Sequence, residues 1–217
     1  MKSLNAWQIA RWVGLVLLAW QMSIIAVAGD ETVAGETQIE MTLGDLLGKE
    51  QSARYEDIID ADELISWRVY APNNDSNELP GVLVYVSPTR SGKIHPQWRD
   101  VMDAQNLIYI SADHSGNYKP TIRRMVLALM AVKVLANKYA FDLNRVTISG
   151  FSGGGRVASI LSVQYPEVFT GALYICGVDF WNKRRAPKVD RLVQNRFVFL
   201  TGSRDFNRDE VRNIHGR

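Results

Sequence analysis

The chain has 217 residues, of which 47% are hydrophobic, and this is enough apolar material for one domain with a sizeable buried core. Its 25 basic and 23 acidic residues nearly cancel, so the charge gives no support to nucleic acid or an anionic membrane surface as a partner. Cys176 is the only cysteine, which excludes an internal disulfide, and its apolar neighbours predict a buried, unreactive thiol.

The first 28 residues have the pattern of a secretory signal peptide. Lys2 and Arg11 provide positive charge, a largely apolar run follows from residue 12, and Ala26-Val27-Ala28 fits the rule for cleavage after small residues. We therefore expect an exported protein, periplasmic or secreted, without a membrane contact after cleavage. An uncleaved anchor is the alternative, because the apolar run is long.

Residues 29–60 are polar and acidic without a strong period, and we expect a surface arm or a short helix there. The remaining residues, 61–217, show strand and helix patterns in alternation. Strands are predicted at 65–70, 81–86, 107–110, 145–149, 171–175 and 196–200. Helices are predicted at 96–105, 121–140 and 154–165, with Arg123 and Arg124 of the second helix facing solvent. Several strands are continuous apolar runs, which favours an α/β fold with a mostly parallel sheet covered on both faces.

The most specific motif is Gly150-Phe151-Ser152-Gly153-Gly154, between a predicted strand and a predicted helix. A serine on a sharp strand-to-helix turn, with glycine two residues away on both sides, is the pattern of a nucleophile elbow. Glycine is needed there because the strand and the helix pass each other closely. A glycine-rich turn without catalytic function is the alternative, which the flanking strand and helix disfavour.

A serine hydroxyl becomes an effective nucleophile when a base takes its proton and the developing oxyanion is stabilised. The backbone N–H of Gly153 is the expected first oxyanion donor, and the loop at residues 87–92 is expected to supply the second. Pro88 has no N–H, so Thr89 is the first candidate for the second donor and Arg90 is the next.

The catalytic acid is expected after a later strand than the nucleophile. Asp205 follows the strand at 196–200 and is the first choice, whereas Asp179 follows the preceding strand and is the second. A loop aspartate that caps the helix beginning near Asn207 is the alternative interpretation of Asp205.

None of the three histidines has the expected position of the base. His215 lies ten residues after Asp205 in a helical pattern, which corresponds to a rise of about 15 Å. His114 follows a central strand, where it could line the pocket or serve as a substitute base. His95 is expected at the surface or at the rim of the pocket.

From about Trp67 to Asp205 the sequence resembles the α/β-hydrolase superfamily. It is most similar there to the exported esterases, polyester depolymerases and prolyl-oligopeptidase-like enzymes, which share a Gly-x-Ser-x-Gly-Gly elbow. The resemblance implies Ser152 as the nucleophile, Gly153 as an oxyanion donor and Asp205 as the triad acid. It also implies a last strand, a last helix and a histidine loop that this chain lacks, so we expect a hydrolase domain that is incomplete at its C-terminus.

Two functions fit these patterns. The first is an exported serine hydrolase that cleaves small-molecule or polymeric carboxylic esters, or less readily peptides, through an acyl-enzyme on Ser152. The alternative is a non-catalytic hydrolase-like binding protein or an inactive truncated fragment. No cofactor or metal is expected, because phosphate-loop and dinucleotide fingerprints are missing and the histidines lack ligand spacing.

Overall fold

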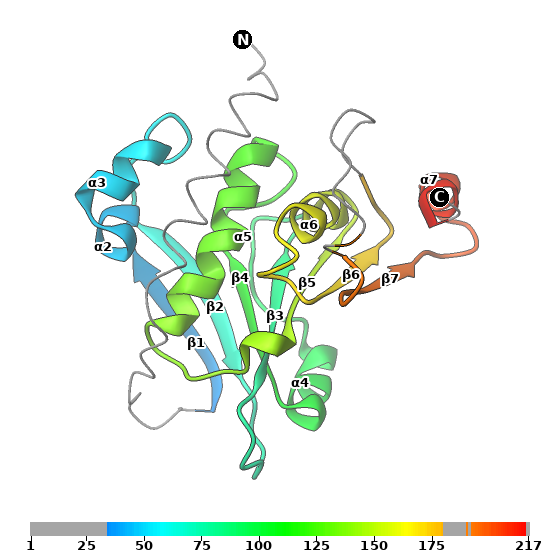
Figure 1. The fold of residues 1–217 in the computed structure, drawn as a ribbon, viewed down its shortest axis with the longest axis horizontal. Helices are drawn as coiled ribbons and strands as arrows, with labels where there is room; N and C mark the ends of the chain where they lie inside the picture. Colours follow the sequence, from blue (N-terminus) through cyan, green and yellow to red (C-terminus); the bar gives the residue numbers. More distant parts are fainter. Residues whose placement is uncertain (1–33, 180–189, 191, 216–217) are drawn as a thin grey trace.

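The computed structural model describes residues 34–179, 190 and 192–215, so the predicted signal peptide lies outside the described residues. Their strands form one sheet in the order β1-β2-β4-β3-β5-β6-β7 (Figure 1). The strands are β1 (Gly35–Met41), β2 (Ile65–Ala71), β3 (Gly81–Val86), β4 (Leu107–Ala112), β5 (Val146–Phe151), β6 (Gly171–Ile175) and β7 (Arg196–Leu200). The β1–β2 and β2–β4 pairs are antiparallel, and the other neighbouring pairs are parallel. The prediction of a mostly parallel sheet is therefore confirmed.

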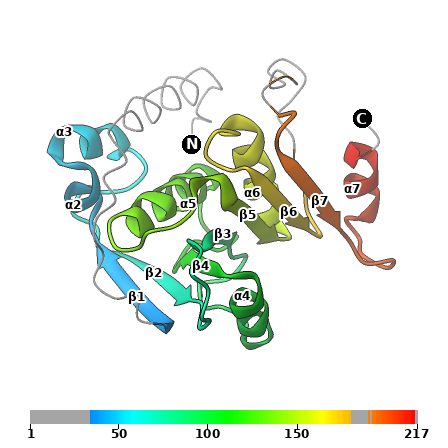
Figure 2. The same ribbon diagram turned by 60° about the horizontal axis from the view of Figure 1, so that its bottom comes forward.

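Helices cover both faces of this sheet, as the sequence predicted. The α-helices are α2 (Leu43–Leu47), α3 (Lys49–Ser52), α4 (Arg99–Gln105), α5 (Thr121–Ala136), α6 (Gly153–Gln164) and α7 (Arg208–His215). The helices α5 and α6 lie on one face, and α4 lies on the other (Figure 2). In the part of the chain that the structure describes, no helix combines the length and the apolar character that a membrane span requires.

The segment before residue 61 contains short helices, α2 and α3, as one of the two predicted alternatives, and also a strand that was not predicted. Strand β1 pairs with β2 along its whole length, from Gly35 opposite Ala71 to Met41 opposite Ile65. The Ile39 side chain of β1 is buried in the main core, whereas the other residues of the strand alternate between partly buried and exposed. An edge strand needs few apolar residues, and for this reason its polar composition concealed it in the sequence.

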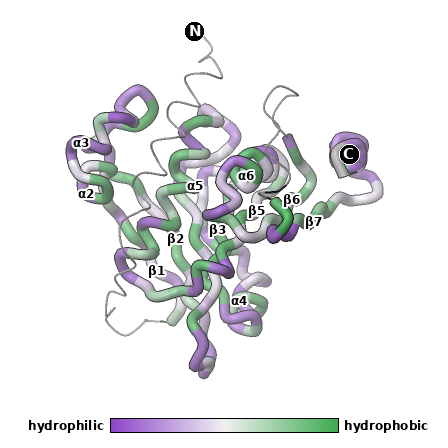
Figure 3. Tube along the Cα trace, in the orientation of Figure 1, coloured by the Kyte–Doolittle hydropathy of each residue, from purple (hydrophilic) through white to green (hydrophobic). Residues whose placement is uncertain are grey.

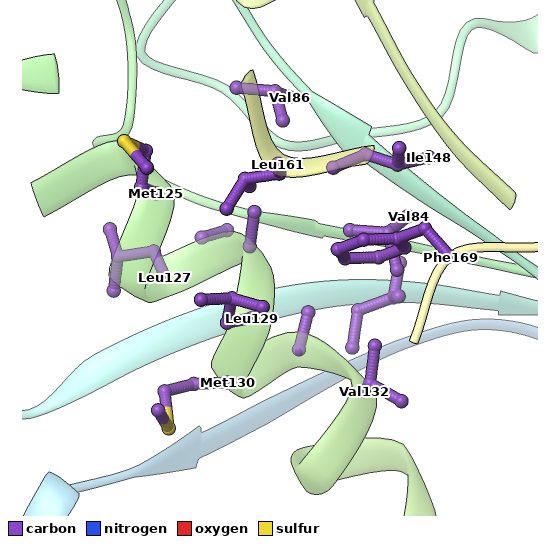
Figure 4. Packing of buried hydrophobic residues seen from close by; sticks show 14 of the residues in the cluster. Val84, Val86, Met125, Leu127, Leu129, Met130, Val132, Ile148, Leu161 and Phe169 are labelled. Carbon is purple, nitrogen blue, oxygen red and sulfur yellow. The ribbon is translucent and has the colours of Figure 1, made fainter. Parts of the chain in front are cut away.

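The core positions the carboxyl ends of the central strands. Apolar residues run along these strands and the helices packed on them, whereas the connecting loops are more polar (Figure 3). Side chains of α5 and α6 pack against β3 and β5 in the main cluster (Figure 4). A smaller cluster packs on the opposite face, between α4 and the sheet: Tyr70, Leu83, Ile94, Met102 and Tyr109. Burial of one large apolar side chain contributes about 1.5–3 kcal/mol to stability. The apolar clusters on the two faces of the sheet therefore fix the carboxyl ends of the central strands, where the candidate site lies.

Candidate active site

Ser152 occupies the turn between β5 and α6 in a backbone conformation that side chains rarely adopt. Its φ is 54° and its ψ is −119°. The Ser152 N–H donates to the Ile175 carbonyl of β6 at 2.8 Å, and the Ser152 carbonyl accepts from the Arg156 N–H of α6 at 3.2 Å. The neighbouring elements thus hold a strained conformation, as a nucleophile elbow requires.

Glycines at positions 150 and 154 allow the backbones around Ser152 to meet. A Cβ on Gly150 would lie 2.3 Å from the carbonyl carbon of Gly154. A Cβ on Gly154 would lie 1.9 Å from the carbonyl oxygen of Val86, at the end of β3. Both contacts are with backbone atoms that cannot rotate away, so any side chain here would force the elbow open.

Unusual backbone conformations gather at the same edge of the sheet. Among non-glycine residues with positive φ, His114, Ser152 and Cys176 have values of 53°, 54° and 55°. They lie just after β4, β5 and β6, respectively. Asn106, at 48°, is the C-cap of α4, where a left-handed residue is common. Conformations of this kind often cluster at functional sites, and the carboxyl edge of this sheet is the candidate site.

Gly153 begins α6, and the first N–H groups of a helix have no partner within that helix. This position suits a donor to an oxyanion. A Cβ on Gly153 would lie 2.3 Å from Oδ1 of Asn117, so the Asn117 carboxamide packs directly against this glycine. The sequence analysis did not identify Asn117, and its only local signal is a turn-forming context after β4.

Arg124 binds both Ser87, at the start of the loop after β3, and Gly153, so this loop lies near Gly153. The backbone N–H of Thr89 in this loop, however, already forms a hydrogen bond. Its N–H donates to the Ser87 hydroxyl at 3.1 Å, and its own hydroxyl lies 3.0 Å from the same oxygen. The Thr89 N–H would have to leave or share that bond to stabilise an oxyanion. The Arg90 carbonyl accepts from the His114 N–H at 2.7 Å, which joins this loop to the loop after β4.

Asp113 fixes the far end of the loop at 87–92. Its Oδ1 accepts from the Gly92 N–H at 2.7 Å, and its Oδ2 accepts from Arg68 Nε at 2.6 Å and from the Ser66 hydroxyl at 3.1 Å. Burial favours the protonated carboxyl, but the Gly92 N–H and Arg68 outweigh it and lower the pKa of Asp113. The ionised carboxylate thus anchors the loop to β2.

Asp205 follows β7 and lies against Cys176. A hydrogen bond from the Cys176 thiol and a second from the Asn207 N–H, 2.7 Å from Oδ1, lower the pKa of Asp205. Burial and the Asp205 carboxylate raise the pKa of the Cys176 thiol. The thiol is only partly buried, because Cys176 lies at the turn after β6 rather than inside the strand. This corrects the prediction of a buried cysteine.

Asp205 and Ser152 belong to the same edge of the sheet. Ser152 bonds to Ile175, the residue before Cys176, and Cys176 in turn contacts Asp205. The side chain of Asn207 also donates to the Cys176 carbonyl at 2.9 Å, which holds the Asp205 turn against the end of β6. The acid candidate and the serine therefore lie at the same edge, after β7 and β5, with the end of β6 between them.

Asp179 has a different environment from Asp205. Burial and the nearby Glu210 carboxylate raise the pKa of Asp179, although Arg156 opposes them. Its backbone N–H and carbonyl both bond to the Ser159 hydroxyl of α6, at 2.8 and 2.7 Å. A triad acid acts as a carboxylate, so Asp205 remains the better candidate.

The histidines are spread over the molecule. His95 is exposed, and its Nδ1 accepts from the Gln97 N–H at 3.4 Å at the start of a short 3-10 turn. His114 is exposed in the loop after β4, and His215 is the last residue of α7. Among the described side chains, no hydrogen bond joins a histidine to Ser152 or Asp205. The structure therefore places the candidate nucleophile, the candidate oxyanion donor and the candidate acid at one edge and leaves the base unassigned.

The structure buries Arg124, whereas the sequence predicted that it faces solvent. The side chain is only 4% exposed, because α5 is buried on nearly all sides from Arg124 to Val132. The uninterrupted apolar run from Met125 to Val132 was the signal for this burial, since a helix with one solvent face would carry polar residues within such a run. As for metals, no group of three or more potential ligands occurs in the described ranges.

No family model and no curated protein sequence matches this chain. Among solved structures, S-formylglutathione hydrolase from Staphylococcus aureus aligns with a TM-score of 0.55, over 84% of this chain and 86% of that protein, at 10% identity. The chain has the α/β-hydrolase fold. In this α/β-hydrolase fold, Ser152 lies where the nucleophile elbow is expected, at the turn from β5 into α6.

Two further solved structures are similar over smaller regions. A thermostable esterase aligns with a TM-score of 0.44 at 16% identity, over 69% of this chain and 53% of that one. The acylaminoacyl peptidase of Pyrococcus horikoshii aligns with a TM-score of 0.43 at 14% identity, over 54% of this chain and 21% of that one. The chain thus spans about half of the esterase and about a fifth of the peptidase.

Proposed function

We propose that this protein is a serine hydrolase that cleaves carboxylic esters through an acyl-enzyme on Ser152. The observation that carries the proposal is the backbone of Ser152, with φ 54° and ψ −119°, between a strand and the first residue of a helix. Such strain costs about 1–3 kcal/mol in a non-glycine residue and needs a compensating reason. Presentation of a reactive hydroxyl above the sheet is that reason in the α/β-hydrolase fold.

In this mechanism the Ser152 hydroxyl attacks the ester carbonyl, and the hydroxyl proton passes to a base. The Gly153 N–H, at the positive end of the α6 dipole, stabilises the negative oxygen of the tetrahedral intermediate. The alcohol then leaves, and water releases the acid from the acyl-enzyme. Asp205, whose carboxylate is favoured by its two hydrogen bonds, orients and stabilises the protonated base.

His114 is the first histidine to test as the base. It follows β4 at the same sheet edge as Ser152, and its main chain is bonded to the loop that should complete the oxyanion hole. Export to the periplasm or the medium remains a proposal that rests on the sequence pattern of residues 1–28. Peptides are the secondary substrate class.

Intact-mass analysis after treatment with a fluorophosphonate probe tests the nucleophile. We expect one adduct on the purified protein, no adduct on Ser152→Ala, and an unchanged adduct on Ser76→Ala, which removes an exposed hydroxyl between β2 and β3. His114→Ala should slow labelling, whereas His95→Ala should not. An unlabelled chain that circular dichroism shows to be folded would reject the hydrolase and favour a binding protein on the same fold.

A further inference from the structure

Arg124 is a buried cation near the N-terminus of α5, the helix that packs across β3 and β4. Within the described residues it forms no ion pair with a carboxylate. Its guanidinium instead donates to three backbone carbonyls. Nε lies 2.7 Å from the Ser115 oxygen, Nη1 lies 3.2 Å from the Gly153 oxygen, and Nη2 lies 3.2 Å from the Ser87 oxygen.

These three carbonyls belong to the three loops that surround the candidate site. Ser87 opens the loop after β3, from which the second oxyanion donor is expected. Ser115 lies in the loop after β4, two residues before the Asn117 side chain that packs on Gly153. Gly153 itself is the proposed first donor. One planar group thus connects both halves of the proposed oxyanion hole.

The geometry of this contact suits arginine and no other side chain. Five N–H donors in a rigid fork can reach three acceptors in fixed directions, whereas a lysine ammonium is a single point at the end of a flexible stem. Burial of a guanidinium without a carboxylate is unfavourable, and an apolar side chain would fill the same space in an otherwise apolar helix. A role beyond packing is therefore needed to explain the residue.

The Arg124 charge also lies close to the candidate site. Burial lowers the pKa of Arg124, but an arginine guanidinium stays protonated in proteins. It binds the carbonyl of Gly153, the same residue whose N–H would face the oxyanion. Fixed positive charge is most useful where negative charge develops in the transition state.

We propose that Arg124 is a positioning residue that sets the distance between the two halves of the oxyanion hole. This proposal rests on the proposed hydrolase function. Arg124→Lys keeps the charge and loses the fork, and Arg124→Met loses both. Arg123→Lys and Arg123→Met are the matched controls, because the neighbouring Arg123 pairs with Glu63, at 2.9 and 2.5 Å, on another side of α5.

The full-length variants are compared by kcat per fluorophosphonate-titrated site and by KM for p-nitrophenyl acetate. For Arg124→Met we expect kcat per site to fall by about 100-fold with KM within about twofold, as for a catalytic group misplaced by about 1 Å. The kcat per site should fall less in Arg124→Lys and should be unchanged in the Arg123 variants. The pH dependence of kcat should be the same in all variants. A purely structural role would reduce the number of titrated sites and leave kcat per site intact, which would overturn the proposal.

Amide hydrogen exchange separates this proposal from the hydrolase proposal. Arg124→Met should speed exchange in the segments 87–92, 113–117 and 152–155 at once, and Arg123→Met should not. A wild-type protein that is neither labelled nor active would reject the hydrolase proposal. Unchanged exchange in the three segments of Arg124→Met would reject the positioning role, whatever the activity.

Discussion

The strained conformation of Ser152 predicts a reversal of the usual order of stability between alanine and glycine. At an ordinary backbone position, glycine is less stable than alanine by about 0.5–1 kcal/mol, because it loses more chain entropy on folding. At position 152 we expect Ser152→Gly to be more stable than Ser152→Ala. Neither variant has the hydroxyl, so its contribution cancels in the comparison.

The size of the reversal follows from the dihedral angles. The Ser152 angles, φ 54° and ψ −119°, are close to the mirror image of those at the first central position of a type II turn. Glycine has no Cβ and adopts mirror-image conformations about equally, so this strain is released in Ser152→Gly alone. Strain of about 1–3 kcal/mol, less the entropic term of about 0.5–1 kcal/mol, leaves glycine favoured by about 1 kcal/mol.

Urea unfolding followed by circular dichroism measures the difference between the two variants. Ser203, an exposed serine without positive φ, provides the control pair, and there Ser203→Ala should be the more stable variant. Equal m-values are required for the comparison. If Ser152→Gly were less stable than Ser152→Ala by the same amount as at position 203, Ser152 would not be strained and the main argument for its function would fail.

Two other substitutions test the contacts that hold the candidate site in place, one at the Ser152 turn and one at the loop after β3. Gly154→Ala places a Cβ 1.9 Å from the Val86 oxygen, and we expect it to lower the free energy of unfolding by more than about 2 kcal/mol. Gly202→Ala, whose Cβ would meet nothing closer than 3.9 Å, should change it by less than about 0.5 kcal/mol in the same urea titration; similar effects of both would refute the steric argument. Asp113→Asn should destabilise by about 1–3 kcal/mol at pH 7, because a charged acceptor of the Gly92 N–H and Arg68 is lost. Folding lowers the pKa of Asp113, so its contribution to the free energy of unfolding is complete above the unfolded pKa of about 3.9 and is lost as the pH falls through the folded pKa. Plots of the free energy of unfolding against pH for the wild type and Asp113→Asn should therefore converge at acidic pH. A difference that does not shrink as the pH falls below the unfolded value of about 3.9 would show that the anchoring is not ionic.

Local patterns were sufficient for the central strands and the elbow. The runs at 81–86 and 107–110 are apolar because the strands are buried on both faces, and the structure confirms both as strands. The glycines at 150 and 154 indicated close backbone contacts before any contact was known. Strand β1 escaped detection because an edge strand with one exposed face requires only scattered apolar residues, such as Ile39.

Side-chain roles that depend on distant segments could not be predicted in the same way. The apolar run after Arg124 indicated a buried helix, but the partners of its guanidinium, Ser87, Ser115 and Gly153, are far apart in the sequence and could not be predicted. Thr89 was a reasonable oxyanion donor until its N–H proved to be bonded to Ser87.

By itself, the sequence determined the α/β class and the position of the strained serine, because strand periodicity and glycine spacing are local properties of the chain. Only the tertiary structure decided that β3 lies between β4 and β5, so that the loops after these three strands meet at one edge. It also decided that the thiol of Cys176 contacts the Asp205 carboxylate beside the Ser152 turn. The order of strands in a sheet and the contacts between their loops depend on how the whole core packs, and no short segment contains that information.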